Sequence, residues 1–320
     1  MILLGALVSV LLGVLAFRQV DIQDIWVGIK EINPLAFVLY FVIRVFNFVL
    51  PGLRSKILFT PLSTISLWEL IKSVWLAFAV NNLIPLRAGE VARVAYLAKK
   101  AEVPTATVVT IVAFERMLDM VGLLLLVLFV AVFLGGDLPM GASSFAVAGT
   151  LSLVVLVLAV VAKYPDAFMR ILKKTSGIFG RFVQSFALKC GSALTDGMKG
   201  LGSLKSFVAV FGLTMGFWGV AVVMVKMWIW AFGIETSWIT PFLLVACLSF
   251  GTALPSAPGN IGVFHWVAIQ SFLLVGIEAK TSTPYALVVH AMEVLPFTLL
   301  AIPFFYRDII KMFKNRPQSE

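Results

Sequence analysis

The chain has 320 residues, of which 61% are hydrophobic and only 13% are charged, and its mean hydropathy is +1.03. This composition excludes an ordinary soluble globular domain and predicts a membrane protein that crosses the bilayer several times. Apolar runs recur from the first residue to Pro303, and no polar block between them reaches the roughly 100 residues of a soluble domain. We therefore expect a single transmembrane domain over residues 1–320.

The net charge of +9 does not indicate a nucleic-acid partner, because the Lys and Arg residues are spread over the connectors between apolar runs. Eight of them lie in the connector 163–205, whereas the connectors 135–142 and 233–237 hold none. This bias predicts that 163–205 and the basic tail 306–320, and with it the C-terminus, are cytoplasmic. The mixture of basic and apolar residues in 163–205 is typical of an amphipathic helix that lies on anionic headgroups.

A helix needs about 20 apolar residues to cross the hydrocarbon core, and somewhat fewer when flanking side chains reach the interface. The runs of suitable length are 1–17, 34–53, 69–86, 105–134, 143–162, 206–231, 238–254, 259–276 and 284–305. The first lacks a basic leader and a clear small-residue cleavage site, which favours a retained span over a signal peptide. The run 105–134 is too long for one upright crossing, so it predicts a strong tilt or an initial half-helix. The expected fold class is all-α, a membrane helix bundle of about eight spans.

The stretch 81–93 interrupts the third run. Its polar residues and its helix-breaking or small residues are Asn81, Asn82, Pro85, Arg87, Gly89, Glu90 and Arg93. Gly89 allows a close approach of the backbone. Breaks and charges at membrane depth are costly, which makes this stretch a functional candidate. Arg87 and Arg93 can each grip a phosphate through two nitrogens, so we predict that the stretch binds an anionic lipid headgroup. The alternative is that both arginines mark a cytoplasmic helix end and pair with Glu90.

A second break follows the apolar run 238–254. It contains Pro258, Gly259, Asn260 and Gly262. If this break lies in a water-accessible cavity, the start of the next helix can offer backbone N–H groups to an anion; a surface turn would have the same sequence. Each break precedes an acid in an apolar run, Glu115 in the first half and Glu293 in the second. This layout predicts an internally repeated transporter with broken or re-entrant helices.

The first acid belongs to a charged cluster. Glu115, Arg116 and Asp119 are spaced three and four residues apart, which places them on adjoining faces of one helix. Charges within a membrane usually face the protein interior, so Glu115 is predicted to pair with Arg87 or Arg93. A purely structural ion pair is the alternative.

Two histidines complete the candidates. His290 and Glu293 share a helix face and are predicted to take up and release a proton, while His265 follows the second break. A hydrogen-bonded structural role is the alternative for each histidine.

Arg44 also lies in an apolar run, where it is a candidate for a cavity, whereas Lys226 is expected to reach an interface.

No metal or cofactor site is predicted. Cys190 and Cys247 lack metal-ligand spacing and a disulfide framework, and the histidines and acids show no recognisable ligand pattern. The chain also lacks a Walker loop, a nucleophile elbow, a zinc-protease helix and an Asp-rich motif. We therefore expect a protein that is not an enzyme, with any transport driven by a gradient or a partner.

Three motifs together resemble the lysylphosphatidylglycerol synthase transmembrane-region family of flippase-like proteins. They are Asn82-Leu83-Ile84-Pro85-Leu86-Arg87-Ala88-Gly89-Glu90-Val91-Ala92-Arg93, Phe114-Glu115-Arg116-Met117-Leu118-Asp119 and Pro255-Ser256-Ala257-Pro258-Gly259-Asn260-Ile261-Gly262. The resemblance covers nearly the whole chain, and it does not include the soluble synthase domain of the larger members. Many members have a Glu three residues after the second glycine of the last motif, where this chain has His265.

The resemblance implies a lipid-handling role. We predict translocation of an anionic phospholipid or a polyprenyl-phosphate-linked lipid across the bacterial inner membrane. The alternatives are a membrane transferase that uses Glu115, Asp119 or His265 as acid or base, and a scaffold that recruits a lipid-synthesis enzyme. A homo-oligomer is a further partner to consider.

Overall fold

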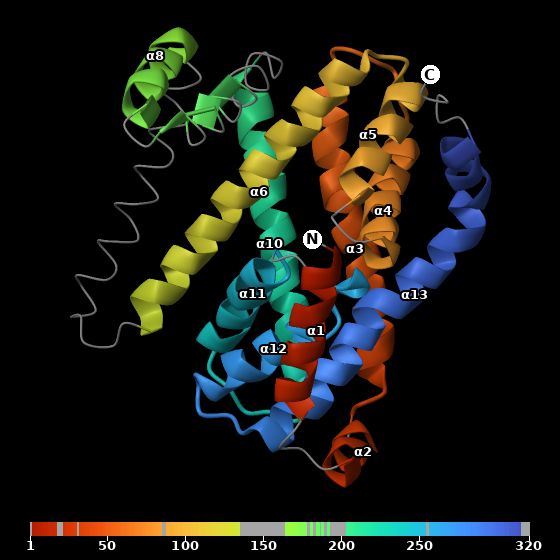
Figure 1. The fold of residues 1–320 in the computed structure, drawn as a ribbon, viewed down its shortest axis with the longest axis vertical. Helices are drawn as coiled ribbons and strands as arrows, with labels where there is room; N and C mark the ends of the chain where they lie inside the picture. Colours follow the sequence, from red (N-terminus) through yellow and green to blue (C-terminus); the bar gives the residue numbers. More distant parts are fainter. Residues whose placement is uncertain are drawn as a thin grey trace.

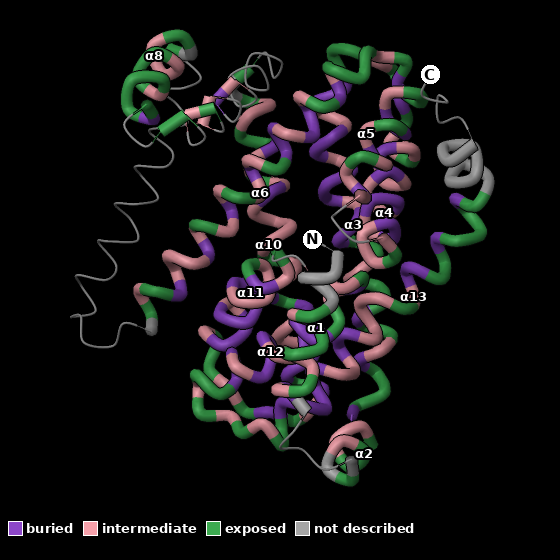
Figure 2. Tube along the Cα trace, viewed as in Figure 1, coloured by how far each residue is buried: buried purple, intermediate pink, exposed green. Residues whose placement is uncertain are grey.

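A computed structural model describes residues 2–17, 22–30, 32–84, 88–134, 164–177, 203–253 and 256–314, with short pieces between 180 and 192. All regular elements of these residues are helices, as the composition predicted. The helices are arranged as one bundle whose buried residues lie on inward faces (Figures 1 and 2). Large apolar side chains such as Leu124, Phe133 and Leu299 are exposed on the outer faces, as expected for a surface that contacts lipid chains.

In the part of the chain that the structure describes, four helices are long and apolar enough to cross a membrane. They are α3 (Leu35–Phe59), α6 (Thr105–Leu134), α10 (Leu204–Ala231) and α13 (Ala279–Lys314). Of the two predictions for 105–134, the half-helix is wrong, because α6 is one continuous helix; it runs obliquely beside α10 (Figure 1). The predicted span 143–162 lies outside the described residues. Among the described residues, the full-length spans are therefore fewer than the eight or so expected.

The other described helices of the bundle are shorter. They are α1 (Ile2–Phe17), α4 (Leu67–Leu83), α5 (Ala88–Ala101), α11 (Ile239–Gly251) and α12 (Val263–Leu273), with a short 3₁₀ turn, η2 (Pro258–Asn260). At about 1.5 Å per residue, α4 is roughly 26 Å long and α12 roughly 17 Å, against a hydrocarbon core of about 30 Å. The helices α4 and α5 form one hairpin, and α11 and α12 form another.

The order of elements repeats. Each half of the chain contains a long helix, a hairpin of two shorter helices and a second long helix. The packing repeats as well: α4 contacts α13 as α11 contacts α6, and α3 contacts α10 between the two halves. The hairpins occupy opposite ends of the bundle, with α4 and α5 in the upper half of Figure 1 and α11 and α12 in the lower half.

Local chemistry explains the first hairpin. Ser66 caps α4 by accepting the Glu69 N–H at 3.3 Å. The helix ends at Leu83, and the backbone of Ile84 is extended, as expected before a proline. Gly89 is required at the start of α5, because a Cβ there would lie 2.0 Å from the Ala77 carbonyl oxygen. The close backbone approach predicted for Gly89 is confirmed.

The second hairpin turns through two glycines with positive φ, Gly259 at +67° and Gly262 at +83°. A side chain at Gly262 is also excluded by α1, since a Cβ would lie 2.0 Å from the Ser9 carbonyl oxygen. Ser9 in addition accepts the N–H of Ala257 at 2.8 Å. The first helix therefore covers one side of the second break.

Two short amphipathic helices lie at opposite ends of the molecule (Figure 1). α8 (Pro165–Ser176) lies within the predicted amphipathic connector and carries Lys173 and Lys174 in its last turn. α2 (Ile22–Lys30) was not predicted; it exposes Trp26, with the Lys30 ammonium 5.1 Å from the ring centre. Apolar residues and a cation on one short helix are typical of a helix at a membrane interface.

Candidate functional site

Three helices meet around a buried carboxylate. Glu115 of α6 is fully buried and pairs with Arg93 of α5 at 2.8 Å. Its other oxygen accepts the Ser55 hydroxyl of α3 at 2.6 Å, and Arg93 also donates to that hydroxyl at 2.9 Å. The predicted pairing of Glu115 with an arginine is thus confirmed for Arg93, while Arg87 lies outside the described residues.

A second ion pair lies beside the first. Arg54 of α3 is 1% exposed and donates to both oxygens of Asp119, at 2.5 and 3.2 Å. It also donates to Thr214 of α10 at 3.0 Å and lies 3.7 Å from Glu115. The sequence analysis missed Arg54, because it follows the apolar run 34–53 directly and resembled an ordinary charged helix end.

The signal that identifies Arg54 is the spacing along α3. Arg44, Asn47, Arg54 and Ser55 recur at intervals of three, seven and one residues, which places them on one face of the helix. The structure confirms this polar face: Asn47 is 3% exposed and donates to the Phe217 carbonyl at 3.3 Å. One side of α3 therefore supplies polar groups along much of its length.

A cavity of about 170 Å³, which we call the arginine cavity, opens next to these pairs. Its charged lining comes from three helices, α3, α5 and α6, and consists of Arg44, Glu90, Arg93, Arg116 and Asp119. Arg116 pairs with Asp119 at 3.2 Å and lies 3.7 Å from Glu90, and its side chain is 46% exposed. Among the described residues, two buried guanidinium nitrogens at this cavity have no hydrogen-bond partner, Nε of Arg44 and Nη1 of Arg93. Arginines that line the cavity therefore have buried donors whose hydrogen-bonding capacity is not used within the described residues.

The predicted amide residues of the first break lie at two places. Asn81 lines the arginine cavity and accepts the Gly89 N–H at 2.8 Å, which joins α4 to the start of α5. Asn82 faces the second break and donates to Thr298 of α13 at 2.9 Å. The backbone carbonyl oxygen of Asn82 would lie 3.7 Å from a Cβ added at Gly259. The two breaks, one from each half of the chain, are therefore adjacent in space.

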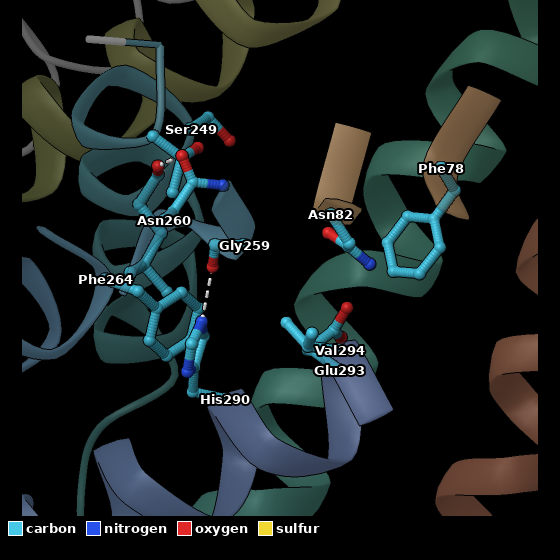
Figure 3. Close-up of a pocket in the computed structure, with 11 residues that line it drawn as sticks. Phe78, Asn82, Ser249, Gly259, Asn260, Phe264, His290, Glu293 and Val294 are labelled. Atoms are coloured by element: carbon cyan, nitrogen blue, oxygen red, sulfur yellow. Dashed lines mark hydrogen bonds between the residues drawn. The ribbon is translucent and has the colours of Figure 1, made fainter. Parts of the chain in front are cut away.

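A cavity of about 210 Å³ lies where the breaks meet, and Figure 3 shows its lining. Phe78 and Asn82 of α4 stand on one side, with Gly259 and Asn260 opposite them and Glu293 of α13 between. The amide nitrogen of Asn260 points toward the open space in this view, while its oxygen accepts the Ser256 hydroxyl at 2.8 Å. This cavity is mainly lined by neutral polar and apolar groups.

One ion pair links the two cavities. Arg44, which lines the arginine cavity, pairs at 2.8 Å with Glu293, which lines the cavity between the breaks. The Arg44 guanidinium also lies 4.7 Å from the ring centre of Phe78, a residue that lines both cavities, and 5.0 Å from that of Phe48. The pair and the two rings thus stand at the junction between the cavities.

The histidines make backbone hydrogen bonds. His290 Nε2 lies 2.6 Å from the Gly259 carbonyl, and since a carbonyl only accepts, Nε2 carries the proton. His265 is 5% exposed, and its Nδ1 accepts the Gly262 N–H at 3.3 Å. The two rings are edge to face, 4.6 Å apart. These contacts hold the second break in shape.

The start of α12 offers fewer free donors than its sequence suggested. The N–H of Gly262 is occupied by His265, and the N–H of Asn260 donates to the Ala257 carbonyl at 3.0 Å. Pro258, at the first position of η2, has no N–H to offer. Gly259 contributes its carbonyl to His290. Anion binding at this break through the amides of Asn260 and Gly262 is therefore not supported.

Other sequence candidates are placed away from the cavities. Lys226 donates to the Thr236 carbonyl at 3.1 Å, in the turn after α10, and so reaches the end of its helix as expected. Cys247 is a free thiol, and Cys190 lies outside the described residues. Within the described ranges, no group of three or more His, Cys, Asp or Glu residues is placed to hold a metal ion.

Residues 2–301 match the family model described as the lysylphosphatidylglycerol synthase TM region. No curated protein and no solved structure matched the chain. The family match includes all three motifs and both cavities, and it indicates a multi-pass membrane protein with a function related to membrane lipids. The chain belongs to the lysylphosphatidylglycerol synthase TM region family.

Proposed function

We propose that this protein moves an anionic lipid between the leaflets of the bacterial inner membrane, and that it is a transporter and not an enzyme. The lipid phosphate binds in the arginine cavity. The observation that carries this proposal is the pair of unpartnered buried donors at that cavity, Arg44 Nε and Arg93 Nη1. Guanidinium groups bind phosphate strongly, and their charge persists at any physiological pH.

The charges of the ion pairs around the cavity are balanced. This balance supports a site that binds one anion, because the cavity carries no large excess of positive charge. Four arginines and four acids form the ion pairs around the cavity, namely Arg44, Arg54, Arg93, Arg116, Glu90, Glu115, Asp119 and Glu293. Their formal charges cancel, which limits the cost of holding them inside a membrane. A phosphate that enters such a site must compete with an acid already present.

The arrangement of helices supports translocation. We propose that the hairpins α4–α5 and α11–α12 are re-entrant and belong to two inverted repeats, with the lipid site near the bilayer midplane where their breaks meet. Helices of roughly 17 to 26 Å end within a hydrocarbon core of about 30 Å, and backbone breaks are tolerated there only when they line a cavity. Movement of one repeat against the other would expose the site to each leaflet in turn.

Transferase chemistry is less well supported by the contacts. A general base needs a carboxylate that is free to take a proton from the substrate. Glu115 is fully buried and held by Arg93 and Ser55, and Asp119 is held by Arg54 and Arg116. These acids serve better as counter-charges that position the arginines.

The proposal is tested with purified protein in liposomes that contain a fluorescent phosphatidylglycerol. A membrane-impermeant reductant bleaches the outer-leaflet label, so lipid exchange raises the bleached fraction above the half expected without flipping. We expect flipping by the wild-type protein and a loss with Arg44→Gln. Lys226→Gln, which removes a cation that lines neither cavity, is the matched control. Flipping no faster than in protein-free liposomes would refute the proposal, as would lipids of altered mass.

A further inference from the structure

The arginines at the cavity differ in how firmly they are held. Arg93 is 1% exposed and contacts Glu115, Ser55 and Ser73, which lie on three different helices. Arg44 has one carboxylate partner in the part of the chain that the structure describes, Glu293. That partner comes from α13, the last helix, and 23% of its side chain is exposed. Of the two arginines with an unpartnered buried nitrogen at this cavity, Arg44 therefore has the partner that is easier to exchange.

We propose that the Glu293 carboxylate occupies the position of the transported anion, and that a phosphate group displaces it from Arg44 during transport. This inference rests on the proposed lipid translocation and names the residue that competes with the substrate. A carboxylate and a phosphate both bind a guanidinium through two oxygens, so one can replace the other at the same nitrogens. Arg44 Nε, which lacks a partner, gives the phosphate a contact that the carboxylate does not use.

The displaced carboxylate has a place to go. Glu293 already lines the cavity between the breaks, and so do Asn82, Ser249 and Asn260. The amide nitrogen of Asn260 points toward that cavity in Figure 3, where it can donate to a carboxylate. Rotation of Glu293 toward these groups keeps its charge hydrogen-bonded after it leaves Arg44, which avoids an unpartnered buried anion.

The exchange also changes the junction between the cavities. Arg44 lies between Glu293 and the Phe78 ring, and Phe78 lines both cavities. When phosphate takes the place of Glu293, the contact between α3 and α13 that closes this junction is lost. Anion binding and the joining of the two cavities are then one event, so the path opens only when a substrate is present.

The test measures binding of a soluble short-chain phosphatidylglycerol to detergent-purified protein by calorimetry, with inorganic phosphate as a second probe. Glu293→Gln removes the competing charge and is expected to raise the affinity about tenfold, the factor that corresponds to one strong charge-assisted hydrogen bond. Arg44→Gln is expected to lose binding. Glu235→Gln, at an exposed loop position, is the matched control and should bind as the wild type does.

The outcomes separate the two proposals. A gain for the short-chain lipid supports displacement by a lipid headgroup. A gain for inorganic phosphate alone supports displacement but makes free phosphate the ligand, which contradicts lipid transport. Unchanged or weaker binding of both probes by folded Glu293→Gln overturns the inference, and lipid flipping by the wild type would then leave the proposed function standing. If Glu293→Gln does not fold, Glu293→Asp takes its place in the test. Its shorter side chain loosens the ion pair with Arg44, so we expect a smaller increase in affinity, and the same criterion applies.

Discussion

Arg54 of α3 holds Asp119 of α6 through two guanidinium nitrogens, at 2.5 and 3.2 Å, and Arg54 is 1% exposed. The pair connects the two long helices of the first half of the chain. It also lies directly beside Glu115, so it fixes the position of the acid that in turn holds Arg93. Stability of the bundle and the geometry of the arginine cavity therefore depend on the same contact.

Removal of one member of this pair leaves the other charge buried without compensation. We expect Arg54→Met and Asp119→Leu each to destabilise the folded state by about 3–5 kcal/mol, and the double variant to be less destabilised than the sum of the two. Reversible unfolding in mixed micelles measures these differences. Additive losses in the double variant would contradict a direct coupling between the two residues.

Gly89 offers a test of the first hairpin. A Cβ at this position would lie 2.0 Å from the backbone oxygen of Ala77, and a backbone atom cannot move aside as a flexible side chain can. We expect Gly89→Ala to lower the unfolding midpoint despite the higher helix propensity of alanine. Gly219→Ala in α10 is the control, because a Cβ there meets no atom within 4 Å. Equal stability of Gly89→Ala and the wild type would be inconsistent with the close packing of α4 and α5.

His265 is predicted to act through its hydrogen bond to the Gly262 N–H and not through its charge. Glutamine can also accept this bond, whereas leucine cannot. We expect His265→Leu to cost about 1 kcal/mol of stability, the usual value of a helix cap, and His265→Gln to cost less. The same unfolding assay compares them. A glutamine variant as unstable as the leucine variant would remove the capping role.

The orientation of the chain can be tested with reporter fusions. The end of α13 and the basic helix α8 lie at one end of the molecule. The turn 233–237, which contains no Lys or Arg, lies at the other end (Figure 1). We expect a fluorescent protein at the C-terminus to fluoresce, as it does in the cytoplasm, and alkaline phosphatase inserted at 233–237 to be active. The opposite pattern would invert the proposed topology.

Sequence reasoning succeeded where the pattern was local. The all-α class follows from apolar runs, Gly89 was identified as a close-approach position, and the chemistry of Glu115 required an arginine partner inside the membrane. It failed where the outcome depended on packing between distant segments. Arg54 looked like a helix end until Asp119 was placed beside it, and the amide of Gly262 looked free until His265 was found to occupy it.

The position of the first break was only partly predictable for the same reason. The stretch 81–93 and the break at 255–262 were identified separately, but their contact depends on how α4 packs against η2 and α13. Periodicity within one helix carries no information on this packing. The short helix α2 was missed because its nine residues fall below the length at which an apolar run is recognised as a span.

The pairing of Arg44 with Glu293 also bears on how the chain is assembled in the cell. Arg44 belongs to α3 and Glu293 to α13, so the arginine is synthesised long before the acid with which it pairs. A charge without its partner inside a membrane is costly, so this pair contributes its stabilisation only after α13 has been synthesised. The contact therefore forms late in synthesis, and it joins the first half of the chain to the second.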